Sequence, residues 1–292
     1  MRDYVIMTDS CCDLNAAEVA ELGITVVPLT FTVDGMSFAD TPDHKDMAPD
    51  DFFARISTGA KCSTAAVNVG QYADAMRAIV EAGRDILCIC FSSALSTTYQ
   101  SACIAAEDLA AEHPEAKITV VDSLCASRGQ GMLVWRAVQH RRETEADIDT
   151  LADFVRAATG DQCHWFMVDD LAQLKRGGRI SAAAALAGTV LGIKPVLQCD
   201  REGRLIPMSK ARGVKAALRA LVDEMEKRAV TLSSEQTVFI CHANCPDYVE
   251  YVSGLLRERF GITDIRADFI GPVIGSHTGG GTLGLFFVGK ER

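Results

Sequence analysis

The pattern of hydrophobic and polar positions divides the chain into two halves of different character. In the first half, short apolar runs at residues 4–8, 86–91 and 118–121 alternate with stretches whose apolar residues recur at helical spacing. This alternation predicts βαβ units built on a parallel sheet. The helices of this half are expected at residues 69–81, 96–111, 127–141 and 144–158.

The segment after the first strand has a less regular pattern. Asp13 is expected to cap a short helix, because a carboxylate just before a helix satisfies its free N–H groups. Residues 24–33 are expected to be extended and to end in a turn at Asp34 and Gly35. A loop-rich stretch with one short helix near residues 50–56 completes the segment.

The pattern changes after Gly160, where we place a domain boundary. A chain of 292 residues is about twice the usual domain size, and the two domains are predicted to span residues 1–160 and 161–292. An alanine-rich stretch at residues 181–191 predicts a tightly packed helix, and residues 194–208 predict a β-hairpin. The second domain is predicted to be mixed α+β, beside a parallel-sheet α/β first domain. Its other elements are expected at residues 164–168, 214–228, 238–241, 248–259, 265–270 and 283–288.

Composition and charge narrow the classes of function. Hydrophobic residues make up 48% of the chain and charged residues 23%, which is enough apolar material for packed cores. The net charge of −10 argues against a nucleic-acid partner, because phosphate binding needs a basic surface. The apolar start is interrupted by Asp9 and is too short for an export signal, and no apolar run of about eighteen residues follows. We therefore expect a cytoplasmic protein.

The chain contains eleven cysteines, an unusually high number. Without an export signal a disulfide framework is not expected, and most of the cysteines are interpreted as small core residues. Cys241, His242 and Cys245 are spaced closely enough to be metal ligands, but no second pair follows at zinc-site spacing. We therefore predict neither a metal site nor a resident cofactor.

Polar residues directly follow three predicted strands of the first half. In open parallel sheets, ligands bind at the carboxyl ends of the strands. Any one of these residues is more simply explained as a helix cap, but three such strand ends together favour a binding site for a small polar group. The three segments are Thr8-Asp9-Ser10, Ser92-Ser93 and Asp122-Ser123.

Two hydroxyl pairs are candidate ligands for an anion. Ser92 and Ser93 precede a predicted helix whose N–H groups and dipole favour negative charge. Ser63 and Thr64 form a second pair before the helix that begins near Asn68. A carboxylate that accepts hydrogen bonds from both pairs would be well satisfied. The sequence leaves open which member of each pair is the direct ligand.

The segment richest in glycine, residues 271–284, contains His277. Gly279, Gly281 and Gly284 match the spacing of a dinucleotide-binding motif, but the helix and strand that must follow such a motif are missing. The sequence also lacks a nucleotide-binding lysine loop. The segment is therefore interpreted as a loop around His277, which either donates a hydrogen bond to an anion or is a structural histidine.

Cations gather in the second half in spite of the acidic composition. Arg176 and Arg179 flank a pair of glycines, and Arg212 follows the predicted hairpin. Arginine suits bidentate contacts with a carboxylate or a phosphate. A solvated, charged turn is the alternative interpretation, and the pattern alone supports both.

The ordered set of these segments resembles the DegV family. Each motif is modest alone, but together they cover nearly the whole chain in order. In the first half the matching segments are Thr8-Asp9-Ser10 with Asp13-Leu14, Ser92-Ser93 with Leu95-Ser96, and Asp122-Ser123. In the second half they are residues 174–181, Ile193-Lys194-Pro195 with Lys210 and Arg212, residues 271–275, and His277.

The resemblance implies a two-domain α/β fold with a long-chain fatty acid buried between the domains. It also implies a role in bacterial fatty-acid activation for phospholipid synthesis. In that role an ATP-dependent fatty acid kinase subunit phosphorylates the carboxylate of the bound acid to an acyl phosphate. A transient contact of the protein with the membrane is compatible with this role in fatty-acid activation.

The resemblance also assigns candidate residues. The family's carboxylate ligands carry over to Ser63 or Thr64, to Ser92 or Ser93, and to His277. Its cations near the carboxylate and on the kinase-facing surface carry over to Arg179, Arg212 and Arg176.

An enzyme in its own right is the main alternative, namely a small-molecule hydrolase or kinase with Ser93 as nucleophile and His277 as base. A lipid sensor that regulates another protein is a third interpretation. The lack of a nucleotide-binding loop favours a carrier, because the partner kinase would supply ATP and Mg²⁺. The sequence therefore predicts a lipid-binding substrate carrier rather than an enzyme.

Overall fold

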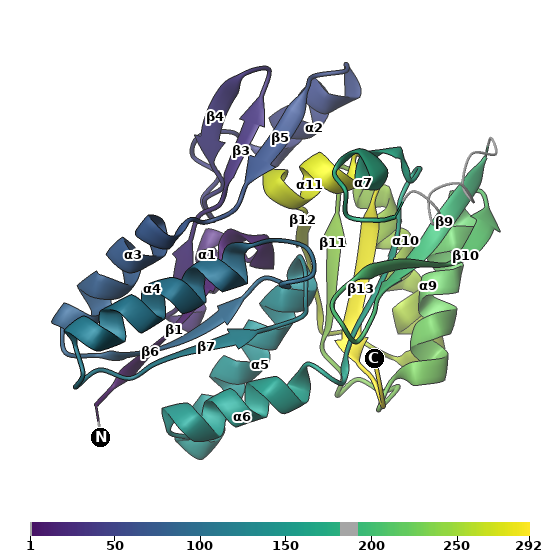
Figure 1. Cartoon of the computed structure of the whole chain (residues 1–292). Helices are drawn as coiled ribbons and strands as arrows, with labels where there is room; N and C mark the ends of the chain where they lie inside the picture. Colours follow the sequence, from purple (N-terminus) through teal and green to yellow (C-terminus); the bar gives the residue numbers. More distant parts are fainter. Residues whose placement is uncertain (1, 182–191) are drawn as a thin grey trace.

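The computed structural model describes residues 2–181 and 192–292, and it places two large sheets side by side with a small third sheet above them (Figure 1). The fold is α/β, as predicted. The helix expected at residues 181–191 lies, apart from Ser181, outside the described residues. Within the described ranges, no helix is long and apolar enough to cross a membrane.

Sheet A is the parallel sheet predicted for the first half. Its strands are β1 (Tyr4–Asp9), β2 (Thr25–Val27), β6 (Asp85–Cys90) and β7 (Ile118–Asp122), in the order β2-β1-β6-β7. Strands β1 and β6 are buried along their whole length, as expected for parallel strands covered on both faces. The helices of this half are α1 (Ala16–Leu22), α3 (Val69–Glu81), α4 (Thr98–Glu112), α5 (Arg128–Thr144) and α6 (Ile148–Ala158). Helices α3 and α4 cover one face of the sheet, and α5 and α6 cover the other (Figure 1).

Sheet C is mixed, which confirms the mixed α+β character predicted for the second half. Its strands are β8 (Gln162–Met167), β9 (Ile193–Cys199), β10 (Leu205–Arg212), β11 (Val238–His242), β12 (Ile265–Phe269) and β13 (Leu283–Val288). In the order β10-β9-β8-β13-β11-β12, β11 and β12 are parallel and the other described neighbours are antiparallel. Helices α9 (Val214–Arg228) and α10 (Pro246–Phe260) pack on this sheet, and so does α5. Gln130 of α5 also donates a hydrogen bond of 2.9 Å to the hydroxyl of Thr8 on β1, so α5 contacts both large sheets.

Sheet B is a small antiparallel sheet whose first strand lies in the stretch predicted to be extended and whose other two strands lie in the stretch predicted to be rich in loops. It consists of β3 (Thr30–Val33), β4 (Met36–Ala39) and β5 (Cys62–Ala65), and α2 (Pro49–Ser57) connects the last two. The predicted turn at Asp34 and Gly35 joins β3 to β4, and both residues have positive φ as a tight hairpin requires. β3 lies within the stretch 24–33 that was predicted to be extended, whereas β4 and β5 escaped prediction because four residues are too few to show a clear alternation.

The cap of α1 differs from the prediction. Asn15, not Asp13, begins this helix, and it forms a capping box with Glu18 through hydrogen bonds of 2.9 and 3.1 Å. Asp13 instead follows a short 3-10 turn and is buried. Its carboxylate accepts hydrogen bonds from the backbone N–H of Gly271, at 3.1 Å, and from the hydroxyl of Ser127. Asp13 therefore ties the first half of the chain to the second.

The glycine-rich segment around His277 contains a helix where we predicted a loop. Helix α11 (Pro272–Thr278) begins with a proline at its first position, which suits a helix start. Gly275 within the helix lowers its helix propensity, and the glycines on both sides of it gave the segment the look of a loop. A side chain at Gly275 would come within 2.8 Å of the Phe53 ring, so the glycine lets α11 pack closely on α2.

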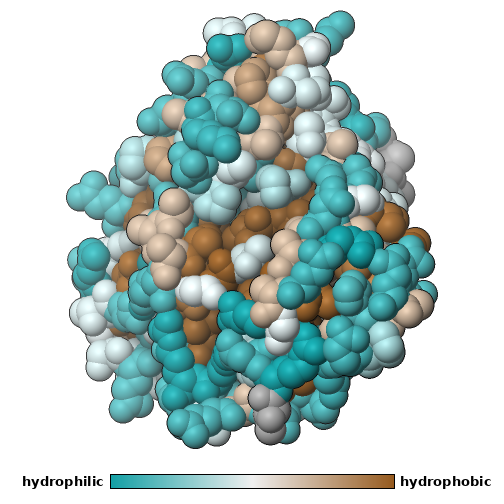
Figure 2. All heavy atoms as spheres, turned by 90° about the vertical axis from the view of Figure 1, so that its left-hand side faces the viewer, coloured by the Kyte–Doolittle hydropathy of each residue, from teal (hydrophilic) through white to brown (hydrophobic). Residues whose placement is uncertain are grey.

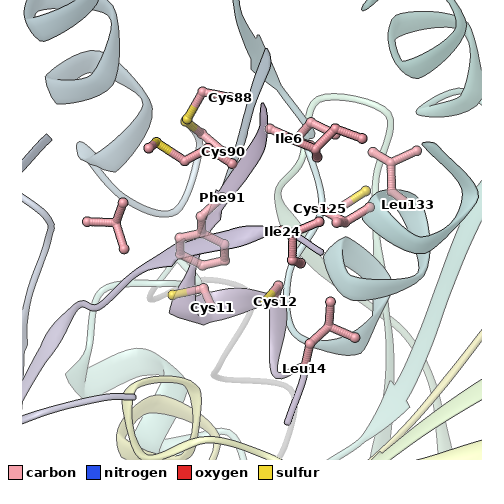
Figure 3. Packing of buried hydrophobic residues seen from close by; sticks show 14 of the residues in the cluster. Ile6, Cys11, Cys12, Leu14, Ile24, Cys88, Cys90, Phe91, Cys125 and Leu133 are labelled. Atoms are coloured by element: carbon pink, nitrogen blue, oxygen red, sulfur yellow. The ribbon is translucent and has the colours of Figure 1, made fainter. Parts of the chain in front are cut away.

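The cysteines belong largely to the core, as predicted. Nine of the eleven are buried, none forms a disulfide, and Cys62 and Cys103 are half-buried. Figure 3 shows two pairs of cysteines, Cys88 and Cys90 of β6 and Cys11 and Cys12 of the turn after β1. Both pairs lie among aliphatic and aromatic side chains of one hydrophobic cluster. These thiols fill space between sheet A and its helices.

We expect Asp13 to make the stability of the fold depend on pH. Burial raises its pKa from 3.8 to about 7, so the folded state binds this proton more tightly than the unfolded chain does. The stabilisation is complete below about pH 4 and is lost as the pH rises to about 7. Urea unfolding of wild type and Asp13→Asn should show the variant gaining stability relative to wild type over this interval, by at most about 1.4 kcal/mol per pH unit. Both proteins keep the nearby charged residues Asp40, Asp268 and Arg128, so these do not distinguish them. If the difference in unfolding free energy between wild type and Asp13→Asn stayed constant with pH, the raised pKa of Asp13 would be contradicted.

Candidate functional site

A cavity of about 420 Å³ lies where the three sheets meet. Phe91 and Ser93, just after β6, border it, whereas no residue of the predicted strand-end segments Thr8-Asp9-Ser10 and Asp122-Ser123 does. One of the three predicted segments at the carboxyl ends of the parallel strands therefore contributes to the cavity wall. Figure 2 shows apolar side chains gathered in a hollow below the lobe formed by sheet B. The apolar wall of the cavity consists of Leu29, Ala66, Phe91, Leu95, Ala126, Phe166, Leu174, Cys199, Leu205, Cys241, Ile270, Val273, Ile274 and Phe286.

Thr64 and His277 join sheet B to helix α11 at this cavity. The hydroxyl Oγ1 of Thr64 lies 2.8 Å from Nε2 of His277, and both residues border the cavity. The two residues are 213 positions apart in the chain. Their contact therefore depends on the packing of α11 against β5, and it places a hydroxyl and an imidazole together in the wall.

His277 is held in its neutral form. Burial, together with the positive charge of Arg179, lowers the pKa of His277 to about 4. Its Nδ1 atom is buried without a hydrogen-bond partner among the described residues. A side chain at Gly177 would lie 2.2 Å from this atom, so the glycine makes room for the ring. At neutral pH the imidazole offers one donor and one acceptor and carries no charge.

Arg179 is the cation of the site. Its Nε donates to the carbonyl oxygen of Leu95 at 3.1 Å, and its NH1 donates to the carbonyl of Gly177. Burial lowers the pKa of Arg179, but a guanidinium remains protonated in proteins. The half-buried side chain therefore brings a positive charge to a largely apolar cavity.

The structure separates the two members of each hydroxyl pair. Thr64 borders the cavity, whereas Ser63 is exposed and is absent from its wall. Ser93 also borders the cavity, whereas Ser92 is fully buried and donates a hydrogen bond of 3.0 Å to the carbonyl of Gly203. Thr64 and Ser93 are therefore the hydroxyls that a ligand in this cavity can reach.

The comparison with known proteins agrees with the resemblance seen in the sequence. Residues 3–290 match the profile of a family described as uncharacterised protein, DegV family. The chain belongs to the DegV family. It is 41% identical to the DegV domain-containing protein CPE0026 of Clostridium perfringens, over 100% of this chain and 99% of that protein.

Solved structures of DegV proteins share the fold over the whole chain. A fatty-acid-binding DegV family protein from Thermus thermophilus is 30% identical, with a TM-score of 0.86 over 99% of this chain and 100% of that one. A DegV lipid-binding protein from Thermotoga maritima is 26% identical, with a TM-score of 0.86 over 99% of each chain. The two-sheet architecture described above is thus the DegV fold.

Two of the candidate arginines of this DegV protein lie outside the cavity wall. Arg176 is exposed at the end of α7 (Ala172–Arg176), and Arg212 is exposed at the end of β10. Neither borders the cavity, in contrast to Arg179. A direct contact with a ligand in the cavity is therefore assigned to Arg179 alone among the three.

Sequence reasoning missed several polar residues of the cavity wall. Ser96, Thr97, Ser127, His164, Thr278 and Thr282 also border the cavity. Ser96 and Thr97 adjoin the predicted Ser92-Ser93 segment and were within reach of the strand-end argument. His164 had no signal beyond its place in a predicted strand, because the cavity forms only when β8 packs opposite α5.

Proposed function

We propose that this protein binds a long-chain fatty acid in the cavity and presents its carboxylate to an ATP-dependent fatty acid kinase that acts in trans. The observation that carries the proposal is an apolar cavity with Thr64, Ser93, Arg179 and His277 in its wall. An apolar wall suits an acyl chain, and two hydroxyls, an imidazole and a guanidinium suit a carboxylate. The lipid and fatty-acid ligands of the related DegV structures support it.

The carboxylate has a simple arrangement in this site. Neutral His277 donates from Nε2 to the hydroxyl oxygen of Thr64, which frees the Thr64 hydrogen for a carboxylate oxygen. Ser93 supplies a second hydroxyl, and Arg179 supplies the opposite charge. Two hydroxyl donors and one nearby cation satisfy an ionised carboxylate without protonating it.

We retain residues 1–160 and 161–292 as the two domains, with the fatty acid between them. Sheet A and its helices belong to the first domain and sheet C to the second. The contact between the hydroxyl of Ser92 and Gly203, and the contact between Asp13 and Gly271, both cross this boundary. In this scheme the two contacts hold the domains together around the acyl chain.

The kinase partner follows from the family resemblance of the sequence. In this proposal the protein works in the cytoplasm, and the product is an acyl phosphate for phospholipid synthesis. Arg176 and Arg212 face the solvent, where they are available to a kinase or to the phosphate that it transfers. The protein itself contributes substrate binding and orientation rather than chemistry.

The alternative of an independent hydrolase or kinase is less well supported. It requires His277 to take a proton from Ser93, but Nε2 of His277 is hydrogen-bonded to Thr64 instead. A histidine with a pKa of about 4 is also a weak base at neutral pH. The geometry therefore favours a carrier over an enzyme.

Reconstitution separates the carrier from the enzyme. The purified protein, incubated with ATP, Mg²⁺ and oleate, should make no acyl phosphate, and adding the fatty acid kinase subunit should start its formation. Hydroxylamine trapping of the acyl phosphate measures both reactions. Turnover by the protein alone would favour the enzymatic alternative, and no turnover with an active kinase would contradict the proposed partner.

A further inference from the structure

Asp122 holds the backbone of Ser93, one of the hydroxyl residues in the cavity wall. The Oδ1 atom of Asp122 accepts a hydrogen bond of 3.2 Å from the backbone N–H of Ser93, which is 29 residues away in the chain. Asp122 ends β7, and Ser93 lies in the turn that follows β6, so the bond joins the carboxyl ends of two neighbouring parallel strands. Asp122 itself does not border the cavity.

The turn after β6 is held at each of its first three N–H groups. The N–H of Phe91 donates to Oδ2 of Asp9 at 2.7 Å. The N–H of Ser92 donates to a backbone carbonyl of the loop after β7 at 3.1 Å. The N–H of Ser93 donates to Asp122, and this contact fixes the residue whose side chain borders the cavity. Asp9 of β1 and Asp122 of β7 therefore hold the turn from the strands on both sides of β6.

The position of the Ser93 hydroxyl depends on this backbone contact. Ser93 is exposed, and within residues 2–181 and 192–292 its hydroxyl makes no hydrogen bond. The hydroxyl is thus available to a carboxylate, but no contact of its own side chain holds it in place. A serine side chain is short, so a displaced backbone nitrogen carries the hydroxyl with it. Small displacements of a group that orients a reacting atom are costly in rate.

Asp122 also has a local role in the fold. The same Oδ1 atom accepts a second hydrogen bond, of 3.0 Å, from the N–H of Leu124, which forms an aspartate turn. Leu124 has a φ of 51°, a conformation that is uncommon for a leucine, so the turn supports the loop after β7. The bond to Leu124 therefore serves the loop, whereas the bond to Ser93 reaches the cavity wall.

We propose that Asp122 is a positioning residue for Ser93, and that its carboxylate fixes the Ser93 hydroxyl against the carboxylate of the bound fatty acid during phosphoryl transfer. The inference rests on the proposed function and extends it to a residue outside the cavity wall. It also gives a role to the predicted strand-end segment Asp122-Ser123, which supports the wall of the cavity and does not contact the ligand.

Substitutions of Asp122 separate its two hydrogen bonds. Asp122→Asn keeps an oxygen that accepts from both N–H groups, so most kinase-dependent phosphorylation of oleate should remain. Asp122→Ser keeps a hydroxyl that forms the same local turn with Leu124 but is too short to reach Ser93. In the reconstituted system its kcat for acyl phosphate formation should fall about tenfold or more, because the Ser93 hydroxyl is misplaced. Extraction of this variant should still yield fatty acid.

The double variant with Ser93→Ala shows whether Asp122 acts through Ser93. Asp122→Ser should lower the residual rate of Ser93→Ala by less than about twofold, because the hydroxyl that it positions is already absent. Asp147→Ala is the control for the loss of a carboxylate that caps backbone N–H groups. Asp147 accepts a hydrogen bond of 2.8 Å from the N–H of Thr150 and does not border the cavity, so its loss should leave phosphorylation unchanged.

Full phosphorylation by Asp122→Ser would overturn the inference, and so would an equal loss of rate in the wild-type and Ser93→Ala backgrounds. Unfolding of Asp122→Ser, which keeps the local turn, would show that the bond to Ser93 serves the fold and would overturn it as well. Wild-type protein that gives no acyl phosphate with an active kinase would instead contradict the proposed function on which the inference rests.

Discussion

Ser93→Ala and His277→Ala are each expected to keep their fatty acid but to lose about 99% of kinase-dependent phosphorylation. Both side chains border the cavity, and His277 also positions the hydroxyl of Thr64. Phosphoryl transfer needs the carboxylate oxygen in line with the γ-phosphate, and a misplacement of about 1 Å costs on the order of 100-fold in rate. Acyl phosphate formation in the reconstituted system measures the loss.

The two substitutions should reduce retention of the fatty acid far less than they reduce the rate of phosphorylation. Burying roughly fourteen methylenes contributes on the order of 11 kcal/mol of gross driving force. One hydrogen bond to a charged group contributes only about 1.5 to 3 kcal/mol, so its loss weakens binding by about 10- to 150-fold. The acyl chain therefore dominates retention, and extraction of the purified variants should still yield fatty acid.

Ser63→Ala is the matched control for these variants. Ser63 is exposed on β5 beside Thr64 and is absent from the cavity wall, so its loss should leave phosphorylation unchanged. Full phosphorylation by both Ser93→Ala and His277→Ala would show that these residues do not hold the carboxylate. Unfolding of both variants would show instead that the serine and the histidine serve the fold.

Arg179→Gln is expected to weaken fatty-acid binding by about 10- to 150-fold, the value of one hydrogen bond to a charged group. The substitution removes the positive charge from the cavity wall and keeps a polar side chain of intermediate length. Removing this charge should also raise the pKa of His277, because Arg179 is one of the two causes of its lowered value. Competition binding of oleate and a histidine NMR titration measure the two effects.

Arg176→Gln provides the comparison, because Arg176 is exposed at the end of α7, three residues before Arg179, and does not border the cavity. We expect oleate to bind this variant as tightly as wild type, with any effect confined to the reaction with the kinase. Equal affinities of both arginine variants for oleate would remove Arg179 from the carboxylate site.

The long, regular elements were predictable from the sequence. Helices Val69–Glu81 and Val214–Arg228 and strand Leu283–Val288 agree with the prediction at both ends. Their apolar periodicity is sustained, and a capping box between Asn68 and Gln71 fixes the start of the first of them. Helix α11 was missed because its short length, its internal Gly275 and the glycines that flank it obscure any periodicity.

The candidate site was predictable only to the level of residue pairs. Ser63 and Thr64 are neighbours on a strand, and adjacent side chains of a strand point to opposite faces. Only one of them can therefore face the cavity. This could not be inferred from the sequence, because the segment was predicted to be part of a loop. The hydrogen bond from Ser92 to Gly203, which is 111 residues away, is what distinguishes the buried Ser92 from the cavity-lining Ser93. Such a contact depends on the packing of the two halves and leaves no local pattern.

The most direct test of fatty-acid binding is mass spectrometry of the ligand that the purified protein carries. Native mass spectrometry should show one long-chain fatty acid per chain, and denaturing extraction should identify it. A variant with a charge in the apolar wall, Phe286→Asp, should carry markedly less, provided that circular dichroism shows it folded. Wild-type protein that carries no fatty acid and also fails to bind added palmitate or oleate would contradict the account.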